Sequence, residues 1–177
     1  FALLAMDQIV NHAAKIRYMF GGKARVPMVS RAPGGGGQQL AAQHSQSLEA
    51  YFLHCPGLKV VCPAFPAEAK WLLKEAIRDD DPVIFLEHEA LYGSKGEVPE
   101  GKYTTPMGKA KIIKEGKDIT IVSFSWMAVL GLKAAHELSK EKIEAEVIDL
   151  RSLNPLDVKT IIASVKKTGR AVVVEEG

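Results

Sequence analysis

Cysteine is scarce in this sequence, and long apolar stretches are missing from it. Cys55 and Cys62 are the two cysteines. They are too few for a disulfide framework, so we expect both to be reduced core residues. No apolar run approaches the roughly 20 residues that a membrane-spanning helix needs. The sequence is therefore not that of a disulfide-stabilised secreted domain, and it predicts no membrane segment.

A dominant charge is also missing. Lysine and arginine together number 23, aspartate and glutamate 21, and the formal net charge is +2. The basic residues are scattered, so the chain lacks the basic patch that nucleic acids and anionic membranes attract. We expect neither a nucleic acid nor a membrane as a partner, and we expect a soluble protein in a reducing compartment.

What is present is an alternation of apolar strands and amphipathic helices. Apolar residues three and four positions apart predict helices, and short runs rich in valine and isoleucine predict strands. The predicted helices are residues 1–20, 45–54, 66–78, 127–139 and one after residue 155. The predicted strands are residues 26–30, 58–61, 83–86, 118–123, 145–150 and 171–174. This alternation predicts an α/β fold with parallel sheets covered on both faces.

The alternation is interrupted once. From Leu91 to about Met107 the periodicity disappears, and the segment holds three glycines and two prolines. We therefore expect two parallel-sheet, three-layer domains, residues 1–92 and 108–177, joined by a linker at 93–107. The first residues already read as helix, and the last strand leads into no further element. We expect both domains to be truncated at these ends.

Two helices carry end signals. Pro66 stands at the first position of its helix, where proline loses no hydrogen bond. Asn154 and Pro155 are expected to cap the last helix, with Asp157 in its first turn and Gly169 closing it.

His44 follows a loop of four consecutive glycines, residues 34–37. We place it at the mouth of the helix predicted from Ser45, where the helix dipole favours the neutral imidazole. It could exchange protons or bind a substrate carboxylate, although a hydrogen-bonded structural histidine is the commoner case. The glycines lack the order of a dinucleotide fingerprint and the lysine of a P-loop. A flexible turn over a cleft is the better interpretation than a phosphate cradle.

Acidic residues are weaker candidates. Glu87 and Glu89, like Glu175 and Glu176, flank strand ends, where ligands of α/β sheets gather; we interpret them as solvated rims. Residues 76–82 end a helix and add three aspartates, so their carbonyl and carboxylate oxygens could form a cation site. On pattern alone a polar turn is the better interpretation. No histidine has the spacing of a zinc ligand.

Seven segments carry a resemblance to a known family. They are residues 6–15, 17–19, 43–46, 54–61, 76–79, 149–155 and 167–170. In one collinear register they look like the beta subunits of pyruvate dehydrogenase, which belong to the transketolase-like, thiamine-diphosphate-dependent 2-oxo acid dehydrogenases. The resemblance implies a transketolase pyrimidine-binding-like domain followed by a transketolase C-terminal-like domain.

The resemblance also implies partners and cofactors. Such enzymes are heterotetramers of two alpha and two beta subunits with thiamine diphosphate between them. The alpha subunit holds the diphosphate and magnesium, and the beta subunit holds the aminopyrimidine. The enzyme decarboxylates a 2-oxo acid and transfers the acyl group to lipoamide on an acyltransferase core. The compartment implied is the bacterial cytoplasm, the mitochondrial matrix or the plastid stroma.

Several residues match functional positions of this family. His44 matches the active-site histidine, and Phe1 matches an aromatic residue near the aminopyrimidine, where flat apolar contact suits the ring. The positions that match those around a structural potassium ion are Met28, Ala76, Ile77, Asp79 and Asp81, the last standing where some members have asparagine.

Other interpretations remain open. The resemblance places the glutamate that bonds the aminopyrimidine upstream of Phe1, so we expect the chain alone to be inactive. Residues 18–22 and 174–177 look more like pyruvate or acetoin enzymes than the branched-chain 2-oxo acid type, and we expect pyruvate. A non-catalytic assembly subunit and a nucleotide-binding module are further alternatives.

Overall fold

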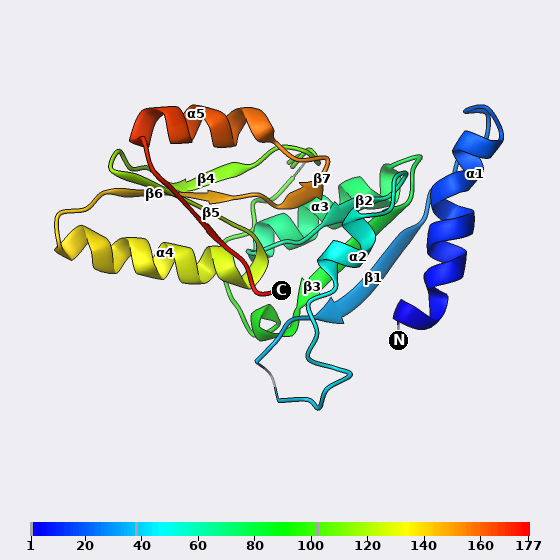
Figure 1. Ribbon diagram of the computed structural model, residues 1–177, viewed down its shortest axis with the longest axis horizontal. Helices are drawn as coiled ribbons and strands as arrows, with labels where there is room; N and C mark the ends of the chain where they lie inside the picture. The colour runs from blue at the N-terminus through cyan, green and yellow to red at the C-terminus, as the bar shows by residue number, and fades with distance from the viewer. Residues whose placement is uncertain (1, 38, 102) are drawn as a thin grey trace.

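Two four-stranded sheets form the framework of the part of the chain that the structure describes (Figure 1). The computed structural model describes residues 2–37, 39–101 and 103–177. The first sheet has the order β1-β3-β2-β7 and the second the order β4-β6-β5-β8. The strands are β1 (Val29–Gly34), β2 (Lys59–Val61), β3 (Val83–His88), β4 (Lys111–Lys114), β5 (Ile119–Ser123), β6 (Ala145–Asp149), β7 (Ser152–Asn154) and β8 (Ala171–Val174).

Helices cover both faces of each sheet. The α-helices of the described residues are α1 (Ala14–Met19), α2 (Glu49–Leu53), α3 (Pro66–Arg78), α4 (Ser125–Lys140) and α5 (Val158–Thr168). Shorter helical pieces are the 3₁₀ turns η1 (Ala2–Ala5) and η3 (Glu89–Leu91) and the π-helical stretch η2 (Gln8–Ala13). No helix in the described residues is long and apolar enough to cross a bilayer.

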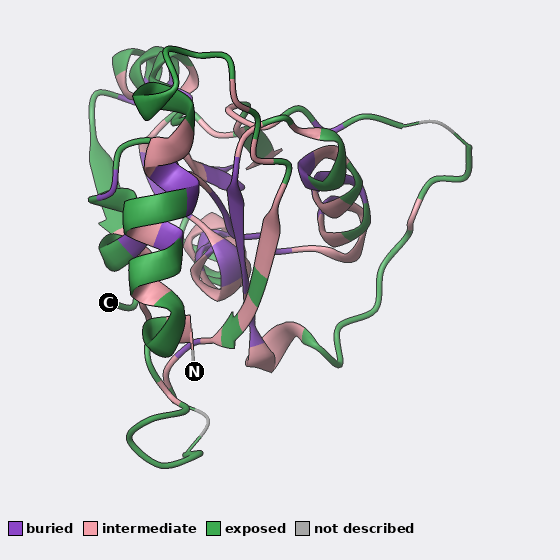
Figure 2. Ribbon diagram, turned by 90° about the vertical axis from the view of Figure 1, so that its right-hand side faces the viewer, coloured by how far each residue is buried: buried purple, intermediate pink, exposed green. Residues whose placement is uncertain are grey.

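Strand β3 forms the centre of the first domain, because its side chains alternate between two cores. Val83 and Phe85 pack with Leu72 and Ala76 of α3. Ile84 and Leu86 face the opposite way, toward a core that also contains Ile9, Ala14, Phe52 and Leu58. Such alternation is the period of a strand buried on both faces, and Figure 2 shows the buried strands enclosed by helices that are exposed on their outer sides.

The second domain repeats this arrangement. On β5 and β6, Ile121 and Val147 pack with Ala135 of α4. Val122 and Ile148 lie on the other face of the sheet, where Ile161 of α5 packs against them. The prediction of two three-layer α/β domains is therefore confirmed.

Both sheets are mixed, not wholly parallel as predicted. Strand β4 runs antiparallel to β6, and β7 runs antiparallel to β2. Neither strand was predicted, because both are short and lack an apolar run. Strand β7 follows β6 in the chain but completes the sheet of the other domain.

Some element boundaries also differ from the predictions. Strand β1 begins three residues late, because the Met28 backbone N–H donates to the Val26 carbonyl in a tight turn. It then includes Pro33 and Gly34, which we predicted to be loop; an edge strand tolerates a proline that donates no hydrogen bond. The helix predicted from Ser45 begins only at Glu49.

The cap of α5 is Asp157, not Asn154 and Pro155. The Asp157 side chain accepts a hydrogen bond from the Thr160 backbone N–H at 3.2 Å. Asn154 instead lies in β7, and its Nδ2 donates to the Leu58 carbonyl at 2.7 Å. The predicted C-terminal signal is confirmed, since Gly169 closes the helix in a left-handed conformation with φ of 69°.

Candidate active site

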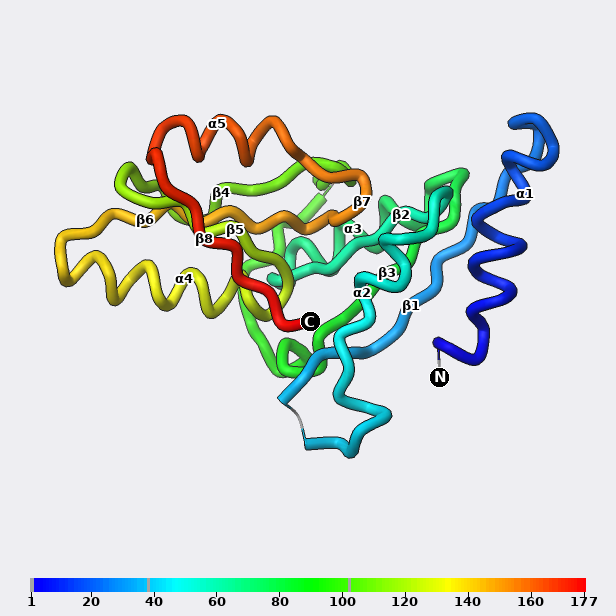
Figure 3. The backbone as a smooth tube through the Cα atoms, in the orientation of Figure 1, coloured from blue at the N-terminus to red at the C-terminus, as the bar shows by residue number. Residues whose placement is uncertain are grey.

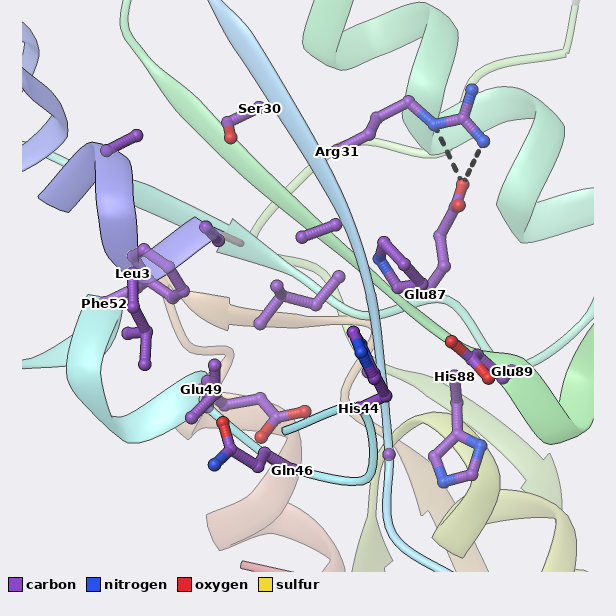
Figure 4. Close-up of a pocket in the computed structure, with 18 of the residues that line it drawn as sticks. Leu3, Ser30, Arg31, His44, Gln46, Glu49, Phe52, Glu87, His88 and Glu89 are labelled. Atoms are coloured by element: carbon purple, nitrogen blue, oxygen red, sulfur yellow. Dashed lines mark hydrogen bonds and ion pairs between the residues drawn. The ribbon is translucent and has the colours of Figure 1, made fainter. Parts of the chain in front are cut away.

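A cavity of about 550 Å³ lies at the carboxyl ends of β1 and β3. These strands are parallel, so their ends meet at one edge of the sheet, where α/β folds bind ligands. Apolar side chains form much of the wall: Leu3, Ile9, Ala32, Leu48, Phe52 and Leu86. Polar and charged residues also line it: Ser30, Arg31, His44, Gln46, Glu49, Glu87, His88 and Glu89 (Figure 4).

His44 lines this cavity, but not from the mouth of a helix. Helix α2 begins five residues later, at Glu49, so the predicted effect of a helix dipole on His44 is wrong. The residue instead sits in the loop that leaves β1 and returns to α2, which we call the glycine-rich loop (residues 35–37 and 39–48). In the view of Figure 3 this loop extends from the body of the protein, close to the C-terminus.

The two ends of the glycine-rich loop are joined at its base. The backbone N–H of Gly35 donates to the Gln46 carbonyl at 3.0 Å. Within the loop, the Ser45 hydroxyl accepts a hydrogen bond from the Leu40 backbone N–H at 3.1 Å. His44 is therefore carried on a closed turn that borders the cavity.

Arg31 and Glu87 face each other across β1 and β3. Arg31 Nη2 and Nε lie 2.6 and 3.0 Å from Glu87 Oε1 (Figure 4). The other carboxylate oxygen of Glu87 accepts a hydrogen bond from the Tyr92 hydroxyl at 3.2 Å. Our interpretation of Glu87 as a solvated rim residue was wrong, because its side chain is 16% exposed and paired with Arg31.

His88 and Glu176 make a second contact at this edge, and it joins the two domains. His88 Nε2 lies 2.8 Å from Glu176 Oε2. Glu176 is exposed, as expected of a rim residue, but the interpretation missed that its carboxylate pairs with His88. We did not single out His88 from the sequence, although its position just after the predicted strand at residues 83–86 was a usable signal.

Glu49 adds a carboxyl group in an unusual state. Burial raises the pKa of Glu49, and the nearby Glu176 carboxylate raises it further. A carboxyl group that retains its proton more readily can donate a hydrogen bond inside the cavity.

The residues predicted around a potassium ion lie elsewhere, before β3. The Met28 carbonyl accepts a hydrogen bond from the Val83 backbone N–H at 2.8 Å. Lys59 Nζ lies 2.7 Å from Asp79 Oδ1 and 3.3 Å from Asp81 Oδ2. This group is at the opposite end of the first sheet from the cavity.

The predicted potassium ligands, Met28, Ala76, Ile77, Asp79 and Asp81, would offer a cation mainly backbone oxygens. The Asp79 carboxylate already balances the charge of Lys59 and accepts a hydrogen bond from the Asp81 backbone N–H. Among the described residues, no group of three or more histidine, cysteine or acidic side chains is placed to hold a metal ion.

The cavity suits a flat, uncharged ring better than a phosphate. Its apolar wall provides the contact that a heteroaromatic ring prefers. Among the described residues that line it, Arg31 is the one lysine or arginine, and its charge is balanced by Glu87. Phe1, predicted to contact such a ring, lies outside the described residues.

Known proteins resemble the whole chain. It is 57% identical over 176 residues to the beta subunit of acetoin:2,6-dichlorophenolindophenol oxidoreductase from Cupriavidus necator, covering 99% of this chain and 52% of that protein. It is 54% identical over 177 residues to the pyruvate dehydrogenase E1 component subunit beta of Rickettsia bellii, covering 100% of this chain and 54% of that protein. A rice mitochondrial pyruvate dehydrogenase E1 subunit beta-1 is 52% identical over 181 residues, covering 100% of this chain and 48% of that protein.

A solved structure resembles the fold. A split-gene transketolase, described as an inactive beta4 tetramer, matches with a TM-score of 0.80 and 28% identity, over 98% of this chain and 53% of that one. The chain thus spans about half the length of the relatives it matches.

Two family models account for both domains. The pyrimidine-binding domain of transketolase matches residues 1–95, and the transketolase C-terminal domain matches residues 108–177. The resemblance found in the sequence is confirmed. The chain belongs to the transketolase family and carries its pyrimidine-binding and C-terminal domains in that order.

Proposed function

We propose that this chain is part of the beta subunit of a pyruvate dehydrogenase, which decarboxylates pyruvate and transfers the acetyl group to lipoamide. In this proposal residues 1–92 form the pyrimidine-binding domain, 93–107 the linker and 108–177 the C-terminal domain. One observation carries it: His44 borders an apolar-walled cavity in a chain 54% identical over its whole length to a pyruvate dehydrogenase beta subunit.

His44 is the proposed catalytic residue. An imidazole can give or take a proton near neutral pH, and a positioned group of this kind contributes about 10²–10⁴-fold to a rate. We assign to His44 the proton transfers that accompany movement of the acyl group to lipoamide.

The cofactor in this proposal is thiamine diphosphate, which supplies the carbanion chemistry of decarboxylation when bound. This chain would hold the aminopyrimidine ring, with Phe1 among its contacts, and the alpha subunit would hold the diphosphate and magnesium. The balanced charge of Arg31 supports this division, because the described lining residues offer no unpaired lysine or arginine to a diphosphate.

The proposed partners are the alpha subunit, in an α2β2 heterotetramer, and a lipoyl acyltransferase core. The proposed potassium ligands are Met28, Ala76, Ile77, Asp79 and Asp81. Since Lys59 already pairs with the Asp79 carboxylate, we assign the contact with potassium chiefly to backbone carbonyl oxygens at these positions.

Turnover by the complete heterotetramer tests the proposal. The enzyme would be assayed with pyruvate, 2-oxoisovalerate and acetoin at equal concentrations, and we expect the highest kcat/KM for pyruvate. A clear preference for either other substrate contradicts the proposal.

An acetoin enzyme is the second candidate, favoured by the 57% identity to the Cupriavidus necator subunit. The same assay separates the two, because 2,6-dichlorophenolindophenol reduction with acetoin would then exceed that with pyruvate. This outcome would leave the fold and the position of His44 unchanged.

The His44→Ala variant separates a catalytic from a purely structural subunit. We expect the heterotetramer to assemble normally and acetyl transfer to lipoamide to fall at least 10²-fold. His136→Ala, on the exposed side of α4, is the matched control and should retain activity. Undiminished transfer in the His44 variant would favour an assembly role.

A further inference from the structure

The side chain of His88 is held by elements of both domains. It lies at the end of β3, and the residue is 6% exposed. On one side the ring packs against Trp126 of α4, with centroids 6.1 Å apart. On another side the Glu176 carboxylate, just after β8, lies 2.8 Å from Nε2.

The hydrogen bonds of His88 define its protonation. The Ala90 backbone N–H donates to Nδ1 at 3.1 Å, so Nδ1 carries no proton. The proton of the neutral ring is then on Nε2, which donates to Glu176 Oε2. This pair is therefore a hydrogen bond from a neutral imidazole to a carboxylate.

The glycine-rich loop rests directly on this pair. A Cβ at Gly35 would lie 2.3 Å from the His88 ring, so the backbone there touches the imidazole. A Cβ at Gly36 would lie 3.3 Å from Glu176 Oε1. At the other end of the loop, the Ser47 hydroxyl donates to Glu176 Oε2 at 3.4 Å.

We propose that His88 and Glu176 are positioning residues, which hold both ends of the glycine-rich loop and so fix His44 at the cavity. Glu176 comes from the C-terminal domain, whereas His44 and His88 come from the pyrimidine-binding domain. The packing of one domain on the other therefore sets the position of the proposed catalytic group. The role in catalysis rests on the proposed function; the anchoring of the loop does not.

Loop mobility tests the anchor without any substrate. A nitroxide on Ala42→Cys, an exposed loop position, would report the motion of the loop in the full-length subunit assembled with its alpha partner. Both cysteines of this chain are buried and should label poorly. We expect Glu176→Ala to speed the motion of the label at least threefold while the melting temperature of the complex stays within a few degrees.

Glu176→Gln is the conservative control. Its amide oxygen can still accept the His88 Nε2 proton, so we expect label mobility within about 1.5-fold of the unmutated protein. Equal mobility in the Ala and Gln variants and in the unmutated protein would overturn the anchor. Equal loosening by Ala and Gln would support an anchor at Glu176 that depends on the charge of its carboxylate.

A glycine pair provides a second, independent comparison. Gly35 and Gly37 both have positive φ, of 101° and 75°, but only a Cβ at Gly35 meets His88. We expect Gly35→Ala to mobilise the label more than Gly37→Ala, and the reverse order contradicts the proposal.

Acetyl transfer to lipoamide then tests the link to catalysis. We expect kcat to fall about tenfold in Glu176→Ala, with little change in KM for pyruvate, and to recover in Glu176→Gln. A loosened loop with unchanged kcat would overturn the positioning role but leave the anchor. Absence of pyruvate turnover in the unmutated enzyme would instead contradict the proposed function.

Discussion

The Arg151 backbone N–H donates a 3.1 Å hydrogen bond to Asp149 Oδ1, while Asp149 Oδ2 has no hydrogen-bond partner among the described residues. The carboxyl group is completely buried at the end of β6. Burial raises the pKa of Asp149 to about 7, and the hydrogen bond from Arg151 offsets only part of that effect.

Asp149 should therefore make stability depend on pH. The folded protein retains this proton up to about pH 7, whereas the unfolded chain releases it near 3.8. The contribution is fully present below pH 3.8 and is lost as the pH rises to 7, a decrease of about 4 kcal/mol in the free energy of unfolding. We expect Asp149→Asn to remove this decrease.

Urea unfolding of the full-length subunit at pH 5 and pH 8 would measure the difference. Asp157→Asn is the control, since hydrogen bonds to Thr160 outweigh burial and lower the pKa of Asp157. That group is ionised throughout this range, so its variant should show no added pH dependence. An Asp149→Asn effect equal at both pH values would contradict the prediction.

Gly57 lies just before β2, where the chain closely approaches the start of α1. Its φ is +100°, and a Cβ there would lie 2.1 Å from the Ala14 carbonyl oxygen. We expect Gly57→Ala to lower the free energy of unfolding by about 2–4 kcal/mol, because it combines backbone strain with a clash against backbone.

Gly93→Ala is the matched control for this variant. Gly93 has no left-handed φ, and a Cβ there would meet nothing within 4 Å. A change within about 0.5 kcal/mol is expected. The denaturant midpoints of the two variants should differ clearly. Similar midpoints would show that the backbone near Ala14 can move away from the added Cβ with little loss in the free energy of unfolding.

Potassium should stabilise the protein if the proposed ligands hold it. At 100 times its Kd, an ion that binds only the folded state adds about 2.7 kcal/mol. The melting temperature in KCl should exceed the melting temperature in LiCl at equal ionic strength, and Asp79→Asn should reduce this difference. Asp80→Asn, whose carboxylate pairs with Arg25 at an exposed position, should preserve it. Identical melting in the two salts would contradict potassium binding.

The elements that were predicted best are those whose start, end and apolar face are set by residues within the element itself. Helix α3 begins at Pro66 and ends at Arg78 as predicted, because the proline at its first position and its apolar face are local signals. Strand β7 could not be predicted this way. It has three residues, and what makes it a strand is pairing with β2, more than 90 positions earlier.

The site was predicted to a similar extent. His44 does line the cavity, but the contacts that support it were missed because they join residues far apart in the sequence. His88 and Glu176 are 88 positions apart, and no residue next to either of them in the sequence predicts that they pair. Strand ends identified the sheet edge, but only the packing of the domains shows which acidic residues are paired and which are solvated.

The antiparallel pairing of β7 with β2 has a consequence during synthesis. Once β3 has been synthesised, β1, β2 and β3 of the first sheet are present. The edge of β2 that pairs with β7 stays unpaired until Asn154 has been synthesised. An unpaired strand edge invites association between nascent chains. The N-terminal domain therefore depends on β7, which comes later in the chain, to cover the edge of β2. A chain whose synthesis stops between the two domains would be prone to aggregate.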